Sequence, residues 1–383
     1  METVKGFKDF LGNEAKKREK IIEIIKEQFN LFGFEPAETP IIEYEEFVKG
    51  NNQNDEAVRD IFRLKDRGER KLALRYEFTF QLKRISKNQK LPYRRYQIGY
   101  VFRDEPIRKG RLRQFIQCDA DIVGSEEKDD AECLSLAKNI FDNLKIPVKI
   151  YVNNRQLVNE IFDNKKIPFE KREQIMREID KFDKLPEEEI KENLKKLNAD
   201  FLFEIFKQKE DFFKKYKNYE KIKKLKDYCT NFGLDIIFKP TLMRGLSYYN
   251  ENVFEVWSEE LDVSLSGGGS YLVDGIQSVG ISFGLEPISI LANVGIDEKT
   301  ILVVSLGQDK EAIKIVKNLR EKNKPTILLT NKSPSKALDY ANSKRIKKVL
   351  FIGENEVKTK KFKLKDMESG KEMLIDESDL KDL

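Results

Sequence analysis

Histidine is absent from the 383 residues of this sequence, and this one absence removes several classes of enzyme. Without an imidazole there is no Ser-His-Asp or Cys-His nucleophile pair, no histidine-ligated zinc and no imidazole general base. Cysteine is scarce, because Cys118, Cys133 and Cys229 lie far apart and form no CxxC pair. This spacing excludes a zinc ribbon and a disulfide framework, and it indicates a reducing compartment.

Long apolar segments and a strong excess of one charge are also lacking. Residues 1–20 contain no apolar signal core and no run of about 18 apolar residues follows, so we expect a cytoplasmic protein with no membrane partner. The 72 Lys and Arg residues against 67 Asp and Glu leave a net charge of +5, too slight to indicate nucleic-acid binding. Hydrophobic residues make up 39% of the chain, including 26 Phe and 13 Tyr, which is enough to build hydrophobic cores. The length of the chain suggests two or three domains.

Hydrophobic spacing predicts helices and strands, with a change of character near residue 156. From about 156 to 230 Lys and Glu dominate and apolar residues recur at helical spacing, which predicts a compact helical insert. The last part has a βαβ pattern, typical of a small α/β domain with a mostly parallel sheet. The other predicted helices are 14–32, 78–86, 131–141, 309–322 and 334–345. The predicted strands are 72–74, 94–103, 114–123, 147–152, 253–257, 261–266, 278–284, 301–307, 325–330 and 347–353.

Strands 94–103 and 114–123 are predicted to share a polar face, because successive side chains of a strand point to opposite sides. The core face of the second strand would hold Ile116, Cys118, Ala120 and Ile122. Its polar face would hold Phe115, Gln117, Asp119, Asp121 and Val123. Antiparallel pairing with Arg103 opposite Phe115 would place Val101 opposite Gln117, Gly99 opposite Asp119, and Gln97 opposite Asp121.

In that pairing Arg103, Gln117 and Asp121 line one sheet surface, and Gly99 leaves room there for a ligand. Alternation by itself favours a plainer interpretation, an ordinary solvated face that carries ion pairs. The loop between the strands is rich in Arg and could bind a triphosphate or a nucleic-acid end through bidentate contacts, with Phe115 stacked on a base. A basic loop that is merely solvated is the alternative.

Three other clusters carry candidate chemistry. Glu77 and Thr79 stand where a strand turns into a helix, so they could hold a ligand ammonium or simply begin the helix. Arg244 precedes a glycine and the pair Tyr248–Tyr249, which suggests either close approach of a ligand or packing. The glycines 267–269 suggest either such an approach or a flexible turn, and neither GxGxxG nor a Walker lysine motif is present.

Taken in order, these motifs resemble the histidyl-tRNA synthetase family of class II aminoacyl-tRNA synthetases. The segments that carry the resemblance are VKGFKDFLGNEAKKRE, LRYEFT, FRDEPIRKGRLRQFIQCDADIVG, RGLSYYNENVFE, SGGGSY, VGISFGLEP and KALDYANSKRIKKVLFIGENEV. The resemblance implies an α+β fold, in which an antiparallel sheet flanked by helices is followed by an α/β anticodon-binding domain. The implied domains are a catalytic domain in two parts, 1–155 and 231–297, a helical insertion, 156–230, and the anticodon-binding domain, 298–383.

The resemblance also implies roles for particular residues. Arg103 and Arg244 would act catalytically on the reacting carboxylate and α-phosphate. Residues implied to bind histidine are Glu77, Thr79, Gln117, Asp121, Tyr248, Tyr249 and Tyr271, with Tyr249 preferred as a direct contact to the imidazole. Residues implied to bind ATP are Arg103, Glu105, Arg111, Arg113, Phe115 and Glu286.

The implied activity is an ATP-dependent ligase that activates L-histidine as histidyl-adenylate and transfers it to its cognate tRNA. The resemblance implies ATP and Mg²⁺ as cofactors. It also implies contacts with the tRNA acceptor stem and anticodon, and assembly as a homodimer. QCDAD resembles the archaeal and eukaryotic branch. Three positions depart from the family pattern: Ser247 replaces Asp, Ser270 replaces Arg, and Pro287 replaces the motif 3 Arg. The alternative is a non-catalytic paralogue, a regulatory or tRNA-sensing subunit.

Overall fold

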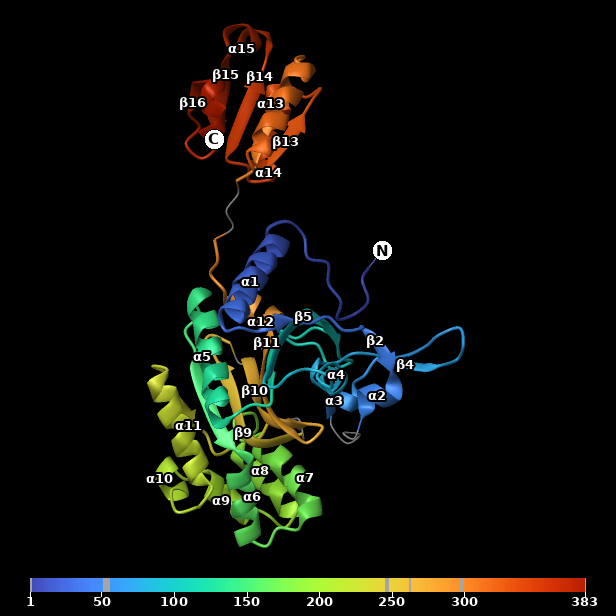
Figure 1. Cartoon of the computed structure of the whole chain (residues 1–383), viewed down its shortest axis with the longest axis vertical. Helices are drawn as coiled ribbons and strands as arrows, with labels where there is room; N and C mark the ends of the chain where they lie inside the picture. The colour runs from blue at the N-terminus through green and yellow to red at the C-terminus, as the bar shows by residue number, and fades with distance from the viewer. Residues whose placement is uncertain (1, 51–55, 245–247, 262, 296–298, 383) are drawn as a thin grey trace. The chain divides into compact units, whose positions relative to one another are not determined.

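The computed structural model describes residues 2–50, 56–244, 248–261, 263–295 and 299–382 (Figure 1). The chain forms two compact units that divide between Val294 and Gly295. The predicted boundary at 297–298 lies outside the described residues. None of the helices in these ranges combines the length and the apolar character that a bilayer span requires.

The first unit is built on an eight-stranded sheet with the strand order β1-β5-β6-β11-β10-β9-β7-β8. The pairs β1–β5 and β7–β8 are parallel and the other pairs are antiparallel, as predicted for the catalytic domain. The strands are β1 Glu35–Pro36, β5 Tyr93–Phe102, β6 Gln114–Val123, β7 Lys149–Asn154, β8 Ile237–Phe238, β9 Tyr249–Trp257, β10 Ser264–Val273 and β11 Ile276–Gly284.

The main hydrophobic core lies between one face of this sheet and the helices that cover it (Figure 1). The predicted core face of β6 is confirmed, because its four apolar side chains pack against α1 and α5 in this core. Cys118, Cys133 and Cys229 are buried free thiols within it. The helices of this part are α1 Gly12–Leu31, α2 Glu45–Lys49, α3 Glu56–Arg59, α4 Thr79–Ile85, α5 Glu127–Asn143 and α12 Leu285–Leu291.

The predicted pairing of β5 with β6 is antiparallel but wrong by two residues. Phe115 lies opposite Val101 rather than Arg103, and Asp121 lies opposite Arg95 rather than Gln97. A shift of two residues leaves every side chain on its predicted face, since the strand repeat is two. The polar face is also buried rather than solvated, with Gln97, Gln117, Asp119 and Asp121 all at most 5% exposed.

The helical segment predicted at 156–230 forms six helices with a hydrophobic core of their own. Its last helix joins this core to the main one, because Ile222 packs in the first and Leu225 and Cys229 pack in the second. The six helices are α6 Arg155–Asn164, α7 Phe169–Ile179, α8 Glu187–Lys196, α9 Phe201–Phe206, α10 Glu210–Phe213 and α11 Tyr219–Asn231.

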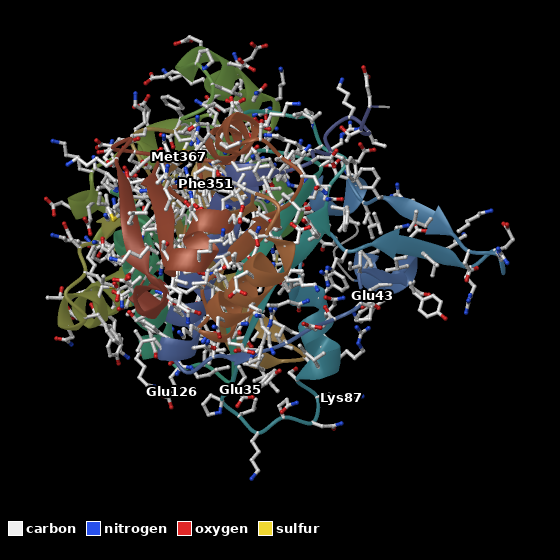
Figure 2. All side chains as sticks on the ribbon, turned by 90° about the horizontal axis from the view of Figure 1, so that it is seen from above. Glu35, Glu43, Lys87, Glu126, Phe351 and Met367 are labelled. Atoms are coloured by element: carbon white, nitrogen blue, oxygen red, sulfur yellow. The ribbon has the colours of Figure 1, made fainter. Side chains whose placement is uncertain are left out.

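A small three-stranded sheet, ordered β2-β4-β3, projects from the first unit near Glu43 (Figure 2). Its strands are β2 Ile42–Tyr44, β3 Arg63–Lys65 and β4 Lys71–Leu74. Charged side chains stand out along the β3–β4 hairpin, whose β3 residues are all exposed. Arg84 of α4 anchors this sheet through an ion pair with the buried Glu43.

The second unit is a five-stranded sheet with the order β13-β12-β14-β15-β16. The strands of the predicted βαβ pattern are parallel to one another, and two antiparallel strands that the prediction missed, β15 and β16, extend the sheet. Apolar residues of β12, β14 and the helices form cores on both faces. The elements are β12 Ile301–Ser305, α13 Asp309–Glu321, β13 Thr326–Leu329, α14 Pro334–Ser343, β14 Lys348–Ile352, α15 Glu354–Thr359, β15 Lys361–Asp366, β16 Glu372–Asp376 and a 3₁₀ helix, Glu377–Asp382.

Candidate active site

The polar face of the large sheet lines a cavity of about 60 Å³. Side chains from the turn before α4, from β6, from the segment before β9, and from β10 and β11 meet there. All nine residues to which the resemblance gives a catalytic or histidine-binding role line this cavity: Glu77, Thr79, Arg103, Gln117, Asp121, Arg244, Tyr248, Tyr249 and Tyr271. The cavity is also lined by residues that were given no role, among them Asp119 of β6, Gly267 of β10, and Gly280 and Ser282 of β11.

Asp121 is held by two partners on its own side of the cavity. The Tyr271 hydroxyl donates a hydrogen bond to Asp121 Oδ1, and Arg95 NH2 lies 2.8 Å from Asp121 Oδ2. Arg95 is fully buried and was missed, although the alternation of β5 places it on the same polar face. Burial raises the pKa of Asp121, with Arg95 and the Tyr271 hydroxyl opposing this effect.

Two further carboxyl groups are buried in the cavity wall. Burial raises the pKa of Glu77 to about 7, with Arg103 opposing, and Tyr248 donates to Glu77 Oε2 at 3.3 Å. Burial and then the nearby Asp121 raise the pKa of Asp119 to about 7, while Arg95, Ser282 and Gln117 oppose the rise. Strongly raised carboxyl pKa values in a cleft are typical of functional sites.

Arg103 and Arg244 enter the cavity from different parts of the chain. Arg103 directly follows β5, and its guanidinium donates to the carbonyl oxygen of Tyr76 at 3.0 Å and to Gln117 Oε1 at 3.2 Å. Arg244 NH1 lies 2.8 Å from Glu255 Oε1, whose other oxygen accepts from Trp257 Nε1 at 2.9 Å. Arg244 has a φ of 59°, an unfavourable backbone conformation for a residue with a side chain.

The three aromatic hydroxyl residues form one cluster over the polar face. The ring of Tyr248 lies 4.8 Å from that of Tyr249 and 5.4 Å from that of Tyr271, measured between centroids. Burial raises the pKa of each phenol, so all three hydroxyl groups are protonated and can donate at neutral pH. Residues 245–247 of the RGLSYY motif, which include the departure at Ser247, lie outside the described residues.

The glycines of this region have different functions from those the sequence suggested. Glycines 267–269 lie inside β10, so the alternative of a flexible turn is wrong. A Cβ at Gly267 would lie 2.3 Å from Arg244 NH1, so this glycine lets the guanidinium cross the strand. The expectation that Gly99 leaves room for a ligand is also wrong, because the Arg75 guanidinium occupies that space, 2.8 Å from the ideal Cβ position.

The predicted ATP-binding residues of the β5–β6 loop gather outside the cavity, next to Arg103. Arg111 NH1 lies 3.3 Å from Glu105 Oε2, and Arg113 Nε donates to the Glu105 carbonyl oxygen at 3.3 Å. The Arg103 guanidinium lies 5.1 Å from the centroid of the half-buried Phe115 ring. Arg103, which lines the cavity, therefore lies beside the aromatic ring of Phe115.

Glu286, also predicted to bind ATP, lies in the core rather than in the cavity. Glu286 is 5% exposed, Arg18 NH2 of α1 lies 2.7 Å from its Oε1, and the backbone N–H of Ile116 donates to its Oε2 at 3.2 Å. These contacts tie α12 to α1 and to β6. Pro287 follows within the first turn of α12, where proline is tolerated.

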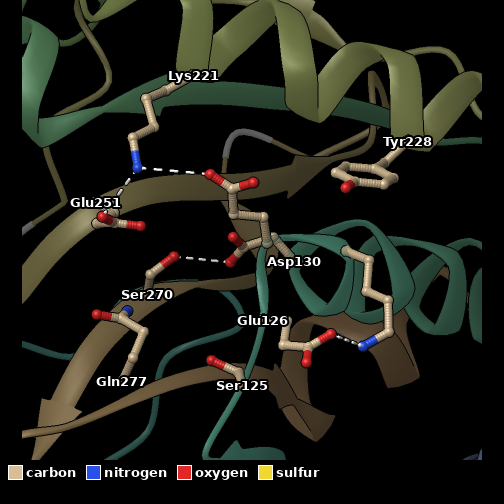
Figure 3. Close-up of a pocket in the computed structure, with 10 residues that line it drawn as sticks. Ser125, Glu126, Asp130, Lys221, Tyr228, Glu251, Ser270 and Gln277 are labelled. Atoms are coloured by element: carbon tan, nitrogen blue, oxygen red, sulfur yellow. Dashed lines mark hydrogen bonds and ion pairs between the residues drawn. The ribbon is translucent and has the colours of Figure 1, made fainter.

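A second pocket, of about 450 Å³, lies between α5, α11 and the ends of β9, β10 and β11 (Figure 3). Lys221 Nζ lies 3.2 Å from Glu251 and 3.7 Å from Glu127 across its mouth. At its base Ser270, which stands where the family pattern has Arg, donates to the buried Asp130 at 2.7 Å. Burial raises the pKa of Asp130 to about 7.

Family models match this chain as a protein of the aminoacyl-tRNA synthetase class, with a catalytic unit followed by an anticodon-binding unit. The model described as Histidyl-tRNA synthetase matches residues 6–288, and the model described as Anticodon binding domain matches residues 300–383. The chain belongs to the histidyl-tRNA synthetase family.

Similar proteins include bacterial and archaeal members. The chain is 33% identical to histidine–tRNA ligase 1 of Bacillus cereus, covering 100% of this chain and 97% of that protein. It is 32% identical to the histidine–tRNA ligase of Methanococcus vannielii, covering 98% of each. The fold is similar to that of histidyl-tRNA synthetase from Nostoc sp. PCC 7120, with a TM-score of 0.85, 24% identity, and coverage of 100% of this chain and 98% of that one.

Proposed function

We propose that this chain activates L-histidine with ATP as histidyl-adenylate and transfers the histidyl group to the 3′ end of its tRNA. The observation that carries the proposal is the convergence of Arg103, Asp121, Arg244 and Tyr249 on one cavity. These residues come from two distant regions of the chain, the β5–β6 pair and the residues at the start of β9, and ordinary sheet packing gives no reason for them to meet. Guanidinium, carboxylate and phenol groups together suit a substrate that carries a carboxylate, an ammonium and an imidazole.

In this proposal the ammonium of histidine lies near Glu77, Thr79 and Gln117. A buried carboxylate beside a bound ammonium gains an opposite charge, so substrate binding favours the ionised form of Glu77. The tyrosine cluster and the acidic residues of β6 face the imidazole. A competing amino acid that lacks ring nitrogens would leave these buried polar groups unpaired, which allows discrimination by roughly 10⁴-fold without editing.

Adenylation joins a histidine carboxylate oxygen to the α-phosphorus of ATP and breaks the bond to the leaving pyrophosphate. The carboxylate is already ionised at neutral pH, so the attack needs no general base, and the chain has no histidine to serve as one. Negative charge builds up on the α-phosphoryl oxygens, and fixed guanidinium groups stabilise it. We assign this function to Arg103 and Arg244.

The loop residues Glu105, Arg111, Arg113 and Phe115 are proposed to hold the nucleotide, with the ring of Phe115 against the base. Glu286 is proposed to contribute indirectly, because its contacts with Arg18 and with the backbone N–H of Ile116 hold the start of β6 in place. Mg²⁺ usually binds through substrate phosphates and one or two carboxylates, so we propose that it enters with ATP. Among the described residues no group of three Asp, Glu or Cys side chains gathers to hold a metal.

Transfer completes the proposed reaction. A hydroxyl at the tRNA 3′ end attacks the adenylate carbonyl, AMP leaves, and the hydroxyl proton passes to a phosphate oxygen of the adenylate. The second unit would contact the anticodon and the helices α6–α11 the acceptor arm. A cytoplasmic homodimer is the proposed form of the enzyme.

Histidine-dependent exchange of pyrophosphate into ATP, followed by charging of the cognate tRNA, tests this proposal. We expect both activities. Exchange without charging would place the fault in the tRNA interface. If neither activity is found with a folded protein, the synthetase proposal fails and the non-catalytic paralogue becomes the better description.

A further inference from the structure

The backbone that carries Arg244 is held by the helical insertion, α6–α11, as well as by the sheet. Met243, the residue before Arg244, is 1% exposed, and its side chain packs in the hydrophobic core of the insertion. The backbone N–H of Met243 donates to Oδ1 of Asp180, the residue that follows α7, at 3.2 Å. Arg244 is therefore one residue away from a point that the end of α7 fixes.

Further contacts hold the segment that leads to Met243. Lys239 Nζ lies 2.6 Å from Oδ2 of Asp183, in the connection between α7 and α8. From the sheet, the side-chain amide of Asn153 donates to the carbonyl oxygens of Pro240 and Leu242, each at 2.9 Å. The segment is thus bound by the sheet and by the insertion, and the insertion supplies the contact nearest to Arg244.

Arg244 depends on this support because its conformation and the path of its side chain are both restrictive. A non-glycine residue with a φ of 59° keeps that conformation only where the surrounding structure imposes it. The guanidinium crosses β10 at Gly267, which lies opposite Glu255 in the sheet, to reach the Glu255 carboxylate. Because NH1 lies only 2.3 Å from the ideal Cβ position of Gly267, the guanidinium has little room to compensate for a shift of its backbone.

We propose that Asp180 is a positioning residue for adenylation, because it fixes the backbone from which Arg244 reaches the reacting groups. This inference rests on the proposed function, in which Arg244 stabilises charge on the α-phosphoryl oxygens. Asp180 lies outside the lining of the cavity, so its effect on the reaction passes through Arg244. The helical insertion thereby takes part in the chemistry of the cavity, in addition to its proposed contact with the tRNA acceptor arm.

Two substitutions of Asp180 separate its function as a hydrogen-bond acceptor from its charge. Asp180→Ala removes the acceptor of the Met243 N–H, whereas Asp180→Asn keeps a side-chain oxygen that can accept it. We expect Asp180→Ala to lower kcat of histidine-dependent pyrophosphate exchange by roughly tenfold and to leave KM for histidine nearly unchanged, since small misplacements of a catalytic group are costly. Asp180→Asn should stay within roughly threefold of the wild type, because the acceptor is retained.

The matched control is Lys184→Ala. Lys184 is the other partner of Asp180, at 2.9 Å from Oδ2, and its side chain is 57% exposed. Removing an exposed ion pair has little effect on stability, and the bond to Met243 stays in place, so kcat should not change. Losses that Asp180→Ala shares with Lys184→Ala or with Asp180→Asn would overturn the inference.

A double-mutant cycle tests whether Asp180 acts through Arg244. In an Arg244→Ala background, Asp180→Ala should cause no further loss of exchange, because the side chain that it positions is already gone. A loss of roughly tenfold in both backgrounds would show that the two residues act independently and would overturn the inference. Wild-type kcat in a folded Asp180→Ala variant would do the same.

Amide hydrogen exchange measures the positioning without any catalysis. Exchange at Met243 should be at least roughly tenfold faster in Asp180→Ala than in the wild type and unchanged in Lys184→Ala, because only the first variant loses the acceptor. Measurement well below the melting temperature keeps this comparison valid if Asp180→Ala is less stable. Faster exchange at Met243, in a protein whose wild type has no pyrophosphate exchange, would sink the proposed function and keep the hold of Asp180 on this backbone. Unchanged exchange at Met243, in a protein with an active wild type, would sink the inference alone.

Discussion

At the scale of single residues, the first unit buries three carboxyl groups whose pKa values lie close to neutrality. Glu77 and Asp119 belong to the cavity, and Asp130 belongs to the second pocket. In each case burial is the largest cause of the shift, because removal from water disfavours the charged form. The folded protein therefore changes charge between about pH 6 and 8, where exposed carboxylates are fully ionised.

Asp130 offers a test of this linkage outside the cavity. Its folded pKa, about 7, is above the unfolded value, so its contribution to stability is present at low pH and is lost as pH rises through 7. Asp130→Asn removes this dependence. We expect the free energy of unfolding of the wild type, relative to the variant, to fall by about 1 kcal/mol or more between pH 5 and pH 8. Urea unfolding at several pH values measures this difference, and a pH-independent difference would contradict it.

Arg244 gives a prediction about catalysis. Arg244→Ala should lower pyrophosphate exchange by roughly 10²- to 10³-fold in a variant that keeps the native fold, as expected when a transition-state charge loses its partner. Near-normal exchange in a folded variant would remove Arg244 from the mechanism.

Gly267→Ala tests the same guanidinium indirectly. The new Cβ would lie 2.3 Å from Arg244 NH1 and force it to move, so we expect a fall in kcat of roughly tenfold, since small misplacements are costly in catalysis. The matched control is Gly295→Ala, where nothing lies within 4 Å of the added atom. Equal kcat in the two variants would show that Arg244 tolerates the displacement.

At the scale of elements, sequence alternation predicted which face each residue of β5 and β6 occupies but not their register. The alternation repeats every two residues, so a slip of two changes no face and leaves no trace in the pattern. The charge of Arg95 was the available signal, because two buried acids on one strand need a positive partner. The contact of Asp121 with Tyr271 of β10 and the position of Asp119 opposite Ser282 of β11 depend on neighbouring strands, which no local pattern of β6 can reveal.

The ion pair between Arg18 of α1 and Glu286 of α12 gives a prediction at this scale. Both side chains are nearly buried, at 6% and 5% exposure, so Arg18→Met leaves an uncompensated charge in the core. We expect a loss of roughly 3–5 kcal/mol in the free energy of unfolding, and substantial recovery in Arg18→Met with Glu286→Gln. Denaturant unfolding of the single and double variants measures both effects. An additive double variant would mean that the pair is not coupled.

At the scale of the whole molecule, the strand pattern of the sequence predicted one part of the second sheet and missed the other. The βαβ pattern indicated the parallel strands β12, β13 and β14, but β15 and β16 were missed. The lysine-rich β15, KFKLKD, resembles a solvated surface segment, and β16 has only three apolar residues between two acids. The cavity could be predicted only through the family resemblance. Its residues lie up to about 200 positions apart, and long-range contacts of this kind leave no local periodicity.

The division into two units predicts a separation of activities. Residues 1–294 contain the whole cavity, so this fragment should keep histidine-dependent pyrophosphate exchange within a few-fold of the full chain. Its charging of tRNA should fall by roughly tenfold or more, because a second binding module raises the effective concentration at the first. Parallel exchange and charging assays on the two proteins test this. Undiminished charging by the fragment would show that the second unit does not contribute to tRNA binding.

The position of Trp257 has a practical consequence. It is the only tryptophan of the chain, and its indole shares Glu255 with Arg244. Any ligand that draws the guanidinium away from Glu255 changes the electrostatic surroundings of this indole. The molecule thus contains an intrinsic fluorophore whose emission reports when the cavity fills, with no label attached.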